Sequence, residues 1–512
     1  RSVGVTGVQT CALPICMIEF DNVSFSYPGQ REGGLDRINL TVGAGECVLL
    51  CGRSGCGKTT LTRLVNGVIP GFYRGEFCGS VRIDGREVFK TPMFELAKRV
   101  GSVFQNPRTQ FFSVDTDSEI VFGLENEGLA RPELRERLER TSRDLQLAPL
   151  RGRSIFELSG GEKQKIAFAS VYAMNPDVFV LDEPSSNLDL RSIYELRERL
   201  RRVKAQGKTI LIAEHRLFYL LDLADRIVYL DQGKIRSIFS PSAFRALSAE
   251  ARAEKGLRAV DLSEEGPAAV PQDTGTGAGE KAALTLRGVG VSFQDRPLLD
   301  RINAEVGRGE IVAICGENGA GKTTFSRCLC GLYPLRTGRD DGIFREGRRA
   351  DERERLKRSF FVMQDVNYEL FAESVEAECS FGIRNADAAE VALTLEKLGL
   401  ASFKDRHPNT LSGGQKQRLA VAVSRISRKE LLVFDEPTAG LDYDGMRRVS
   451  ALIRELAGEG KIVFVVTHDY ELICHACTRV FHFQSGTLAA DLPVTPGTAA
   501  PIRALLGIER GE

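Results

Sequence analysis

Two glycine-rich stretches carry the residue types that bind phosphate. The first runs from Gly52 to Thr59 (GRSGCGKT) and the second from Gly316 to Thr323 (GENGAGKT). Both fit the pattern G-x-x-x-x-G-K-[ST], and each follows an apolar run and precedes a helical pattern. Glycines let backbone N–H groups converge on phosphate oxygens, because no Cβ stands in the way. The sequence therefore predicts two phosphate-binding loops, each between a buried strand and a helix.

A lysine and a hydroxyl side chain in each loop suit a nucleoside triphosphate. Lys58 and Lys322 would reach the β- and γ-phosphates, and the hydroxyls of Thr59 and Thr323 would hold Mg²⁺. The helix that follows would point its positive end at the same anion. The residues of the two loops that we expect to contact the nucleotide are Gly52, Ser54, Gly55, Gly57, Lys58, Thr59, Thr60, Gly316, Asn318, Gly319, Gly321, Lys322, Thr323 and Thr324.

An acidic pair ends an apolar run in each half, in the strings FVLDEP and LVFDEP. Each run would be a buried strand that delivers two carboxylates at its end. The first carboxylate, Asp182 or Asp435, would orient Mg²⁺. The second, Glu183 or Glu436, could polarise an attacking water molecule. The pairs therefore predict hydrolytic chemistry beside the phosphate loops.

An LSGG string begins 24 residues before the aspartate of each pair and opens a predicted helix. The string LDRIN at residues 35–39 also recurs at residues 299–303, so the chain contains a duplicated domain. The residues of the two LSGG strings that we expect at the nucleotide are Ser159, Gly160, Gly161, Ser412, Gly413 and Gly414.

The motifs require sheets that hold them in place. Residues 17–27, 35–42 and 80–88 alternate in polarity and predict a small antiparallel sheet, and residues 117–175 predict a mainly helical insertion. Short apolar runs predict a parallel sheet in each half. These runs are residues 178–181, 209–213 and 226–230 in the first half, and residues 430–434, 462–467 and 480–483 in the second.

This set of motifs resembles the ATP-binding-cassette (ABC) ATPases over nearly all of residues 17–490. The resemblance implies an α/β fold of two P-loop NTPase domains, each with a parallel-sheet core, an antiparallel β-subdomain and a helical subdomain. It also implies ATP and Mg²⁺ as cofactors. We expect the domains at residues 17–248 and 283–512, with a flexible linker at 249–282. Residues 1–16 resemble translated sequencing-adapter sequence, and we expect them to be a non-native leader.

The resemblance assigns roles to further residues. Gln105 and Gln364 match a glutamine that contacts Mg²⁺ and the attacking water and senses a membrane partner. His215 and His468 resemble the histidine that contacts the γ-phosphate. The aromatic residues that would stack on adenine are Tyr27 and Phe293.

Family geometry also implies that the two domains pair head to tail, so that the phosphate loop of one faces the Ser-Gly-Gly of the other. Neither site lacks an expected catalytic residue, and both should hydrolyse ATP. Site one would combine Lys58, Gln105, Glu183 and His215 with Ser412, Gly413 and Gly414. Site two would combine Lys322, Gln364, Glu436 and His468 with Ser159, Gly160 and Gly161.

The composition of the chain argues against some classes of binding partner. The 512-residue chain has 69 Lys+Arg against 69 Asp+Glu, and zero net charge disfavours a nucleic-acid partner. No stretch approaches the roughly 18 uninterrupted apolar residues of a membrane span. A membrane role would therefore be peripheral, through another protein. The 12 Cys are scattered along the chain, which suits buried thiols in a reducing compartment.

Finer strings resemble the ATPases of energy-coupling-factor importers. They are FQNPRTQFF at residues 104–112, EIVFGLEN at 119–126 and AEHR at 213–216. The resemblance implies uptake of a vitamin, a vitamin precursor or a metal ion through an integral membrane scaffold and a substrate-binding membrane protein, at the cytoplasmic face of the membrane. The alternatives are the ATPase of a monosaccharide importer, a soluble two-cassette translation factor and a DNA-maintenance ATPase.

A groove for a partner helix is expected just after each glutamine. Of Phe111 and Phe112, one ring would be buried and the other would line the groove. In the second half, Tyr368, Leu370 and Phe371 occupy the corresponding region, so the two grooves should prefer different helices.

Overall fold

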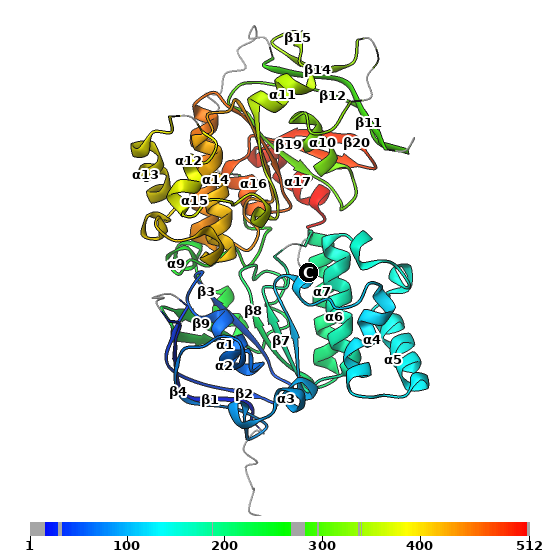
Figure 1. Ribbon diagram of the computed structural model, residues 1–512, viewed down its shortest axis with the longest axis vertical. Coiled ribbons are helices and arrows are strands. Elements are labelled where there is room, and N and C mark those ends of the chain that lie inside the picture. Colours follow the sequence, from blue (N-terminus) through cyan, green and yellow to red (C-terminus); the bar gives the residue numbers. More distant parts are fainter. Residues whose placement is uncertain are drawn as a thin grey trace, which may run out of the picture. The chain divides into compact units, whose positions relative to one another are not determined.

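The computed structural model describes residues 16–28, 33–186, 188–267, 282–293, 296–335, 338, 340–383 and 385–508. The chain forms two compact units, each with one copy of the duplicated sequence (Figure 1). Unit one consists of residues 1–186 and 193–257, and unit two of residues 187–192 and 258–512. Residues 1–15 of the expected leader, residues 268–281 of the expected linker and the side chain of Phe293 lie outside the described residues.

Unit one contains two sheets. The antiparallel sheet has the order β2-β1-β4-β5, and the second sheet has the order β10-β9-β3-β8-β7-β6. The strands of the second sheet are parallel, apart from β10, which pairs antiparallel with β9. The strands of unit one are β1 (Cys16–Ser26), β2 (Leu35–Gly43), β3 (Cys47–Gly52), β4 (Glu76–Ile83), β5 (Arg86–Glu87), β6 (Val100–Val103), β7 (Val178–Asp182), β8 (Thr209–Ala213), β9 (Arg226–Asp231) and β10 (Lys234–Phe239).

Unit two repeats this topology. Its antiparallel sheet has the order β12-β11-β14-β15, and its second sheet has the order β16-β17-β18-β13-β19-β20, in which β20 is antiparallel to β19. The strands of unit two are β11 (Leu284–Phe293), β12 (Arg296–Val306), β13 (Ile311–Cys315), β14 (Gly342–Arg345), β15 (Arg348–Arg349), β16 (Ser359–Val362), β17 (Leu431–Asp435), β18 (Ile462–Val466), β19 (Arg479–Gln484) and β20 (Thr487–Pro493).

Helices cover the sheets and form a separate cluster in each unit. Helices α4, α5 and α6 pack on one another in unit one, and α12, α13 and α14 do so in unit two (Figure 1). The helices that begin in the first half are α1 (Lys58–Val65), α2 (Val68–Gly71), α3 (Met93–Arg99), α4 (Thr116–Asn126), α5 (Arg131–Asp144), α6 (Gly160–Met174), α7 (Leu190–Ala205), α8 (Pro241–Arg245) and α9 (Ala249–Glu254). Those of the second half are α10 (Lys322–Leu329), α11 (Glu352–Arg358), α12 (Val375–Ser380), α13 (Ala388–Lys397), α14 (Gly413–Ile426), α15 (Tyr443–Gly458), α16 (Tyr470–Ala476) and α17 (Ala499–Leu506).

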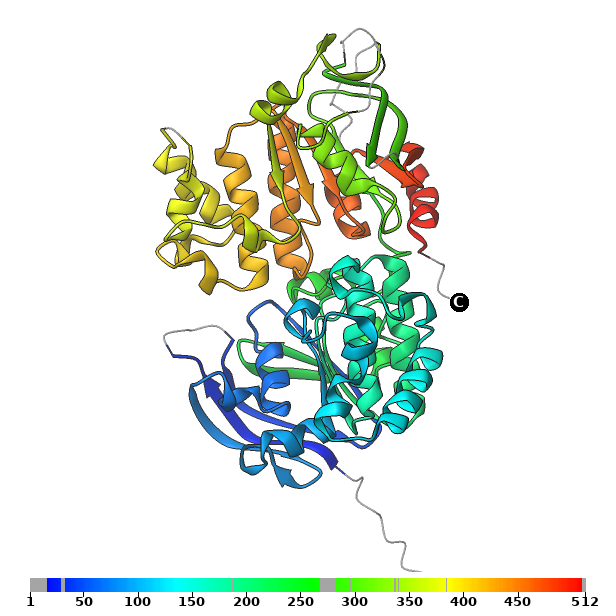
Figure 2. The ribbon, with the colours of Figure 1, turned by 45° about the vertical axis from the view of Figure 1, so that its right-hand side comes forward.

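The predicted α/β fold class is therefore confirmed for both halves, with an antiparallel sheet, a mainly parallel sheet and a helical cluster in each. Figure 2, turned by 45°, shows the yellow helices α12 and α13 still lying together at one side of the strands of unit two. Within the described ranges, none of the helices combines the length and the apolar composition that crossing a membrane requires.

The strand that leads into the first phosphate loop is buried along its whole length. All six residues of β3 are buried, because helices and the antiparallel sheet cover the two faces of the parallel sheet. On one face, Leu50 of β3 shares a core with Phe20 of β1 and Leu61 of α1. On the other, Phe168 of α6 stacks with Phe179 of β7 at 6.2 Å between ring centroids. This packing fixes the carboxyl ends of β3 and β7, where the motif residues stand.

Part of the expected linker is folded. The region 249–267 includes helix α9, and Arg53 donates a hydrogen bond to the carbonyl of Glu254 at 2.6 Å. The Tyr229 hydroxyl donates to the carbonyl of Lys255 at 3.2 Å. The following residues belong to unit two, where Arg258 is buried. The structure thus differs from a linker that is flexible from its first residue, because hydrogen bonds tie this stretch to the folded units.

Candidate nucleotide-binding and active sites

Both phosphate loops adopt backbone conformations that require glycine. Gly52 has φ 141°, and a Cβ on it would lie 2.1 Å from the carbonyl oxygen of Leu230. Gly316 has φ 139°, and its Cβ would lie 2.2 Å from the carbonyl oxygen of Phe483. Gly57, with φ 107°, precedes the first residue of α1. The loops therefore turn tightly from the strand into the helix, and the N-terminus of the helix faces the loop.

The loop lysines are buried, with their amines inside the loops. Lys58 Nζ donates to the carbonyl oxygens of Gly52 at 3.0 Å and Arg53 at 3.1 Å. It also lies 3.3 Å from Nε2 of His215. Lys322 Nζ donates to the carbonyls of the first two residues of its own loop at 2.6 and 2.9 Å. Each amine is thus centred among the backbone groups that we expect to surround the phosphates.

The acidic pair of unit one meets three of the expected partners. Thr59 Oγ1 donates to Oδ1 of Asp182 at 3.0 Å. Glu183 Oε2 accepts a hydrogen bond from Nε2 of Gln105 at 2.7 Å, and its Oε1 lies 3.3 Å from Nε2 of His215. These residues are far apart along the chain. The sequence motifs predicted that they share one site, and in the fold they lie close together.

The acidic pair of unit two is assembled less completely. Glu436 Oε1 lies 3.9 Å from Nε2 of His468, and its Oε2 accepts a long hydrogen bond of 3.5 Å from Thr467. Gln364 is exposed and, among the described residues, forms no hydrogen bond to Glu436. The structure therefore brings His468, but not Gln364, to the expected catalytic carboxylate.

Burial raises the pKa of the first carboxylate in each pair. The pKa of Asp182 rises to about 7, because burial and the neighbouring Glu183 charge outweigh the hydrogen bond from Thr59. The pKa of Asp435 rises to about 6 through burial, against the lowering effect of Lys322. A divalent cation would favour the charged form of both groups.

The donor chemistry fits Mg²⁺. Each unit offers one carboxylate and one threonine hydroxyl: half-buried Asp182 accepts a hydrogen bond from Thr59 in unit one, and buried Asp435 and the loop residue Thr323 hold the same places in unit two. Mg²⁺ prefers such hard oxygen ligands and completes its shell with water and nucleotide phosphates. Within the described ranges, no cluster of three or more His, Cys, Asp or Glu side chains could hold a metal ion by itself. We expect the ion to bind together with the nucleotide, whose phosphates would supply further oxygen ligands.

Both LSGG serines cap a helix. Ser159 Oγ accepts from the backbone N of Glu162 at 3.3 Å, and Glu162 Oε2 accepts from the backbone N of Ser159 at 2.8 Å. Ser412 and Gln415 form the same pair of bonds at the start of α14. Ser159 and Ser412 are exposed, so both helix N-termini present N–H groups at the surface of their own unit.

The expected adenine-stacking tyrosine lies close to the first phosphate loop. The Tyr27 hydroxyl is 3.3 Å from Oγ1 of Thr60 and accepts a hydrogen bond from Arg63 at 3.2 Å. Its ring meets Tyr73 edge to face at 6.2 Å. The ring is therefore held beside the loop by contacts from α1 and the residues after α2.

Sequence reasoning missed a buried glutamate behind His215. Glu214 is 2% exposed and accepts hydrogen bonds from the backbone N of Ser185 at 3.1 Å and of His215 at 2.7 Å. It also accepts from the Tyr219 hydroxyl at 2.9 Å. These bonds fix the loop that carries the histidine. The sequence signals were its position directly after the apolar run of β8 and its place in the string AEHR, to which no role for Glu214 was assigned.

In unit two, an arginine from the expected linker supports the histidine loop. Arg258 donates from Nη2 to Asp469 at 2.5 Å and from Nε to Glu471 at 2.8 Å. Thr438 donates to the second oxygen of Asp469 at 2.7 Å, and the backbone N of Ala259 donates to Glu471 at 3.0 Å. Asp469 also caps α16 and directly follows the histidine. Sequence reasoning did not find this network, because composition alone placed Arg258 in a linker.

Comparisons with known proteins identify the family. The family model described as "ABC transporter" matches residues 35–186 and 299–439. A "Putative ABC transporter ATP-binding protein" of Treponema denticola is 49% identical, and the match covers 93% of this chain and 97% of that protein. A second protein with the same description from that organism is 39% identical, covering 93% and 96%.

A solved structure shares the fold. It is described as "Model of ribosome-bound archaeal Pelota and ABCE1", is 21% identical with a TM-score of 0.67, and the match covers 94% of this chain and 80% of that chain. At this identity, the likeness concerns the fold alone. The family match and the close relatives show that the chain belongs to the ABC transporter family, with two ABC ATPase domains that imply ATP binding and hydrolysis.

Proposed function

We propose that the protein is the ATP-hydrolysing subunit of an energy-coupling-factor type importer. It couples ATP turnover to uptake of a vitamin, a vitamin precursor or a metal ion through separate membrane proteins, as a peripheral protein of the cytoplasmic face. The 49% identity to the "Putative ABC transporter ATP-binding protein" of Treponema denticola, over 93% of the chain, supports the role of a transporter ATPase. The importer type is proposed from the strings at residues 104–112, 119–126 and 213–216. The translation-factor alternative is supported by similarity of fold only.

The contacts in unit one suggest how one ATP molecule would be bound and hydrolysed. The backbone of the loop and Lys58 bind the phosphates, and Asp182 with Thr59 would hold Mg²⁺. The ion would neutralise developing charge on the phosphates. Glu183 is oriented by Gln105 and His215, so that one carboxylate oxygen can order a water molecule for attack.

We further propose that each site is completed by the LSGG helix of the other half. The exposed capping serine of each unit, Ser159 or Ser412, offers a helix N-terminus to an anion. Such an arrangement would make the two sites interdependent, because neither phosphate loop would close around ATP alone.

A pair of matched variants tests this sharing. In a Glu436→Gln background, adding Ser412→Arg should lower single-turnover hydrolysis at the site with Glu183 at least about tenfold, because a bulky cation replaces a hydroxyl at the γ-phosphate. Adding Ser159→Arg to the same background should have little effect. If Ser159→Arg is the damaging change instead, each site is contained in one half and the head-to-tail proposal is wrong.

In each unit, an aromatic pair that includes an exposed ring offers a surface for the membrane partner. Phe112 is 74% exposed and stacks on Phe122 at 5.0 Å, and Phe371 is 68% exposed and lies 6.3 Å from Phe381. Phe111 is half-buried, so Phe112 is the ring available for a groove. The two pairs stand at equivalent positions and follow the two glutamines in sequence, which favours a contact that reports to the nucleotide.

Buried glutamates hold both aromatic positions. Glu119 accepts from the backbone N of Phe112 at 3.0 Å, and Glu378 accepts from the backbone N of Phe371 at 2.7 Å. The surroundings differ, however, since Tyr368 adds a ring that is 63% exposed in unit two. We therefore propose that each unit accepts a short amphipathic helix, and that the two helices differ.

Charge placed on these surfaces should release the protein from membranes. In cells that also express the neighbouring membrane proteins, Phe112→Asp with Phe371→Asp should move most of the protein from the membrane to the soluble fraction, with nucleotide binding unchanged. Ile238→Asp, at another exposed apolar residue of unit one, is the control and should stay with the membrane. A wild-type protein that sediments with ribosomes rather than with membranes would favour the translation-factor function.

A further inference from the structure

The loop that carries Gln364 in unit two is closed by a glutamate, whereas the matching loop of unit one is closed by a glutamine. In unit one, Oε1 of Gln110 accepts a hydrogen bond from the backbone N of Phe104 at 3.4 Å. In unit two, Oε1 of Glu369 accepts a hydrogen bond from the backbone N of Met363 at 3.0 Å. The two side chains stand five residues after the motif glutamine of their own loop, so they hold equivalent places.

Gln110 makes a second hydrogen bond that a charged carboxylate cannot make. Its Nε2 donates to the carbonyl oxygen of Ser102 at 3.1 Å. Ser102 is the third residue of β6, and Phe361 is the third residue of β16, in the same register with the neighbouring strand. Within the described ranges, Glu369 forms only the bond from the backbone. A protonated carboxyl group carries one O–H donor and could make both bonds.

The surroundings of Glu369 do not compensate a negative charge. Among the residues that the structure describes, no Lys, Arg or His forms an ion pair with it. Helix α14 packs against this loop, but its Lys416 donates to Oδ1 of Asn367 at 2.7 Å. The other charged groups here are carboxylates, namely Asp365 of the loop itself and Glu378 of α12, which is 2% exposed.

These surroundings favour a protonated Glu369. Burial raises the pKa of Glu369 to about 7, the hydrogen bond from Met363 opposes this rise, and the charge of Glu378 adds to it. In unit one, Glu119 holds the place of Glu378, but its neighbour Gln110 is neutral at every pH. The two loops therefore differ in a group that can gain or lose a proton near neutral pH.

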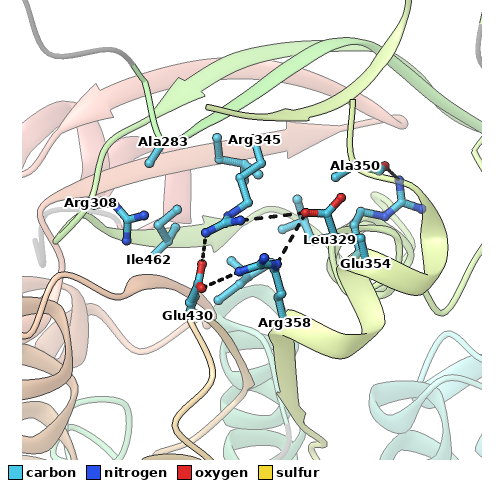
Figure 3. Close-up of a pocket in the computed structure, with 12 residues that line it drawn as sticks. Ala283, Arg308, Leu329, Arg345, Ala350, Glu354, Arg358, Glu430 and Ile462 are labelled. Carbon is cyan, nitrogen blue, oxygen red and sulfur yellow. Dashed lines mark hydrogen bonds and ion pairs between the residues drawn. The ribbon is translucent and has the colours of Figure 1, made fainter. Parts of the chain in front are cut away.

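Other partly buried glutamates of unit two are paired with arginines (Figure 3). Glu430 pairs with Arg345 and lies 2.7 Å from Nη1 of Arg358. Glu354 lies 3.4 Å from Nε of the same Arg358. Glu369 differs from both, because the charged group that acts on its pKa is another carboxylate.

We propose that Glu369 is a positioning residue of the second ATP site, which holds the loop of Gln364 while it carries a proton and loosens that loop when it loses the proton. Protonated Glu369 would accept from Met363 and donate to the carbonyl of Phe361, as Gln110 does in unit one. Charged Glu369 would have no hydrogen for that carbonyl. Gln364 directly follows Met363, so the loop sets where its side chain lies.

The positions of the two motif glutamines agree with this difference. Gln105 donates to Glu183 at 2.7 Å, whereas Gln364 forms no hydrogen bond to Glu436 within the part of the chain that the structure describes. The inference rests on the proposed role of Gln364 at the nucleotide, and it does not depend on the type of importer.

Glu369→Gln, which installs the residue of unit one, should remove a pH dependence from the second site. In a Glu183→Gln background, single-turnover hydrolysis by the full chain reports the site with Glu436. Adding Glu369→Gln should leave this rate similar at pH 6 and raise it at least about threefold at pH 8.5, because glutamine makes both bonds at every pH. The ratio of the two rates at each pH removes the titration of groups that both proteins share.

Glu373→Gln is the matched control, because Glu373 is an exposed glutamate of the same segment. Its ratio to the parent should stay near one at both pH values. The reciprocal change Gln110→Glu, in a Glu436→Gln background, should give the first site a fall of at least about threefold between pH 6 and pH 8.5. The proposal is overturned if Glu369→Gln changes the rate by the same factor at both pH values, or not at all.

Thermal melting without ATP tests the proton on Glu369 separately. A carboxyl pKa that is raised in the folded state gives stability that is lost as pH rises toward about 7. Glu369→Gln should therefore melt above the wild type at pH 8.5, and the difference should shrink as pH is lowered to 5. If melting shows this pattern but the ratio of rates does not, the positioning role is wrong. A Glu183→Gln parent that hydrolyses no ATP at any pH would overturn the proposed second site, and the positioning role with it.

Discussion

The double substitution Glu183→Gln with Glu436→Gln should leave ATP binding intact and lower steady-state hydrolysis at least about a hundredfold. Each glutamate follows a buried strand and lies next to a histidine, at 3.3 Å in unit one and 3.9 Å in unit two. A glutamine keeps the size of the side chain and one acceptor oxygen but cannot take up a proton. The loss should therefore fall on turnover and not on the affinity for ATP.

Two measurements on the full chain separate the effect on ATP binding from the effect on turnover. Filter binding of labelled ATP with Mg²⁺ should give similar affinities for the variant and the wild type, while phosphate release should differ by the stated factor. Glu198→Gln is the control, since Glu198 is an exposed glutamate of α7. Hydrolysis at the wild-type rate in the double variant would remove both glutamates from the mechanism.

The fold and most contacts of the first site follow from local sequence patterns. The apolar runs predicted for the parallel sheet appear as β7, β8 and β9, because strands buried on both faces must be apolar along their length. The phosphate loop is fixed by steric demands on its glycines, as at Gly52. Once strand and loop are set, Thr59 and Asp182 meet at the end of neighbouring elements. Such features are local, and the sequence shows them directly.

Contacts between distant surface segments were not predictable in this way. The string ERERLKR of α11 has the composition of a solvated helix, yet Arg355 in it is buried. Likewise, Gln364 and Gln105 occupy the same place in their motifs, but only Gln105 meets its glutamate. Burial of a charge depends on which segments pack over it, and that information is not in the local pattern.

Arg258→Met should destabilise unit two by about 3–5 kcal/mol, the usual cost of removing one partner from a buried ion pair. Arg258 is 2% exposed and is hydrogen-bonded to both Asp469 and Glu471, which are themselves buried. Without the guanidinium, two carboxylates would face each other in the interior. Urea unfolding followed by a probe in unit two should show the loss, and Arg348→Met, at an exposed arginine of β15, should not.

The pH dependence provides a second test of the same network. Burial already raises the pKa of Glu471, and the Arg258 charge opposes that rise. Removing Arg258 should raise the pKa of Glu471 further above its unfolded value. A folded state with a raised carboxyl pKa binds more protons than the unfolded state, so the stability of the variant should fall as pH increases through that range. The deficit of Arg258→Met relative to the wild type should therefore be smaller at low pH than at neutral pH.

Adding Glu471→Gln to Arg258→Met should recover part of the loss at neutral pH, because it removes one of the two uncompensated charges. The double variant should also show a weaker pH dependence than Arg258→Met alone. Equal stability of Arg258→Met and the wild type at neutral pH would contradict a buried ion network. Since Asp469 directly follows His468 and caps α16, the single variant should in addition slow hydrolysis at the site with Glu436, measured in a Glu183→Gln background.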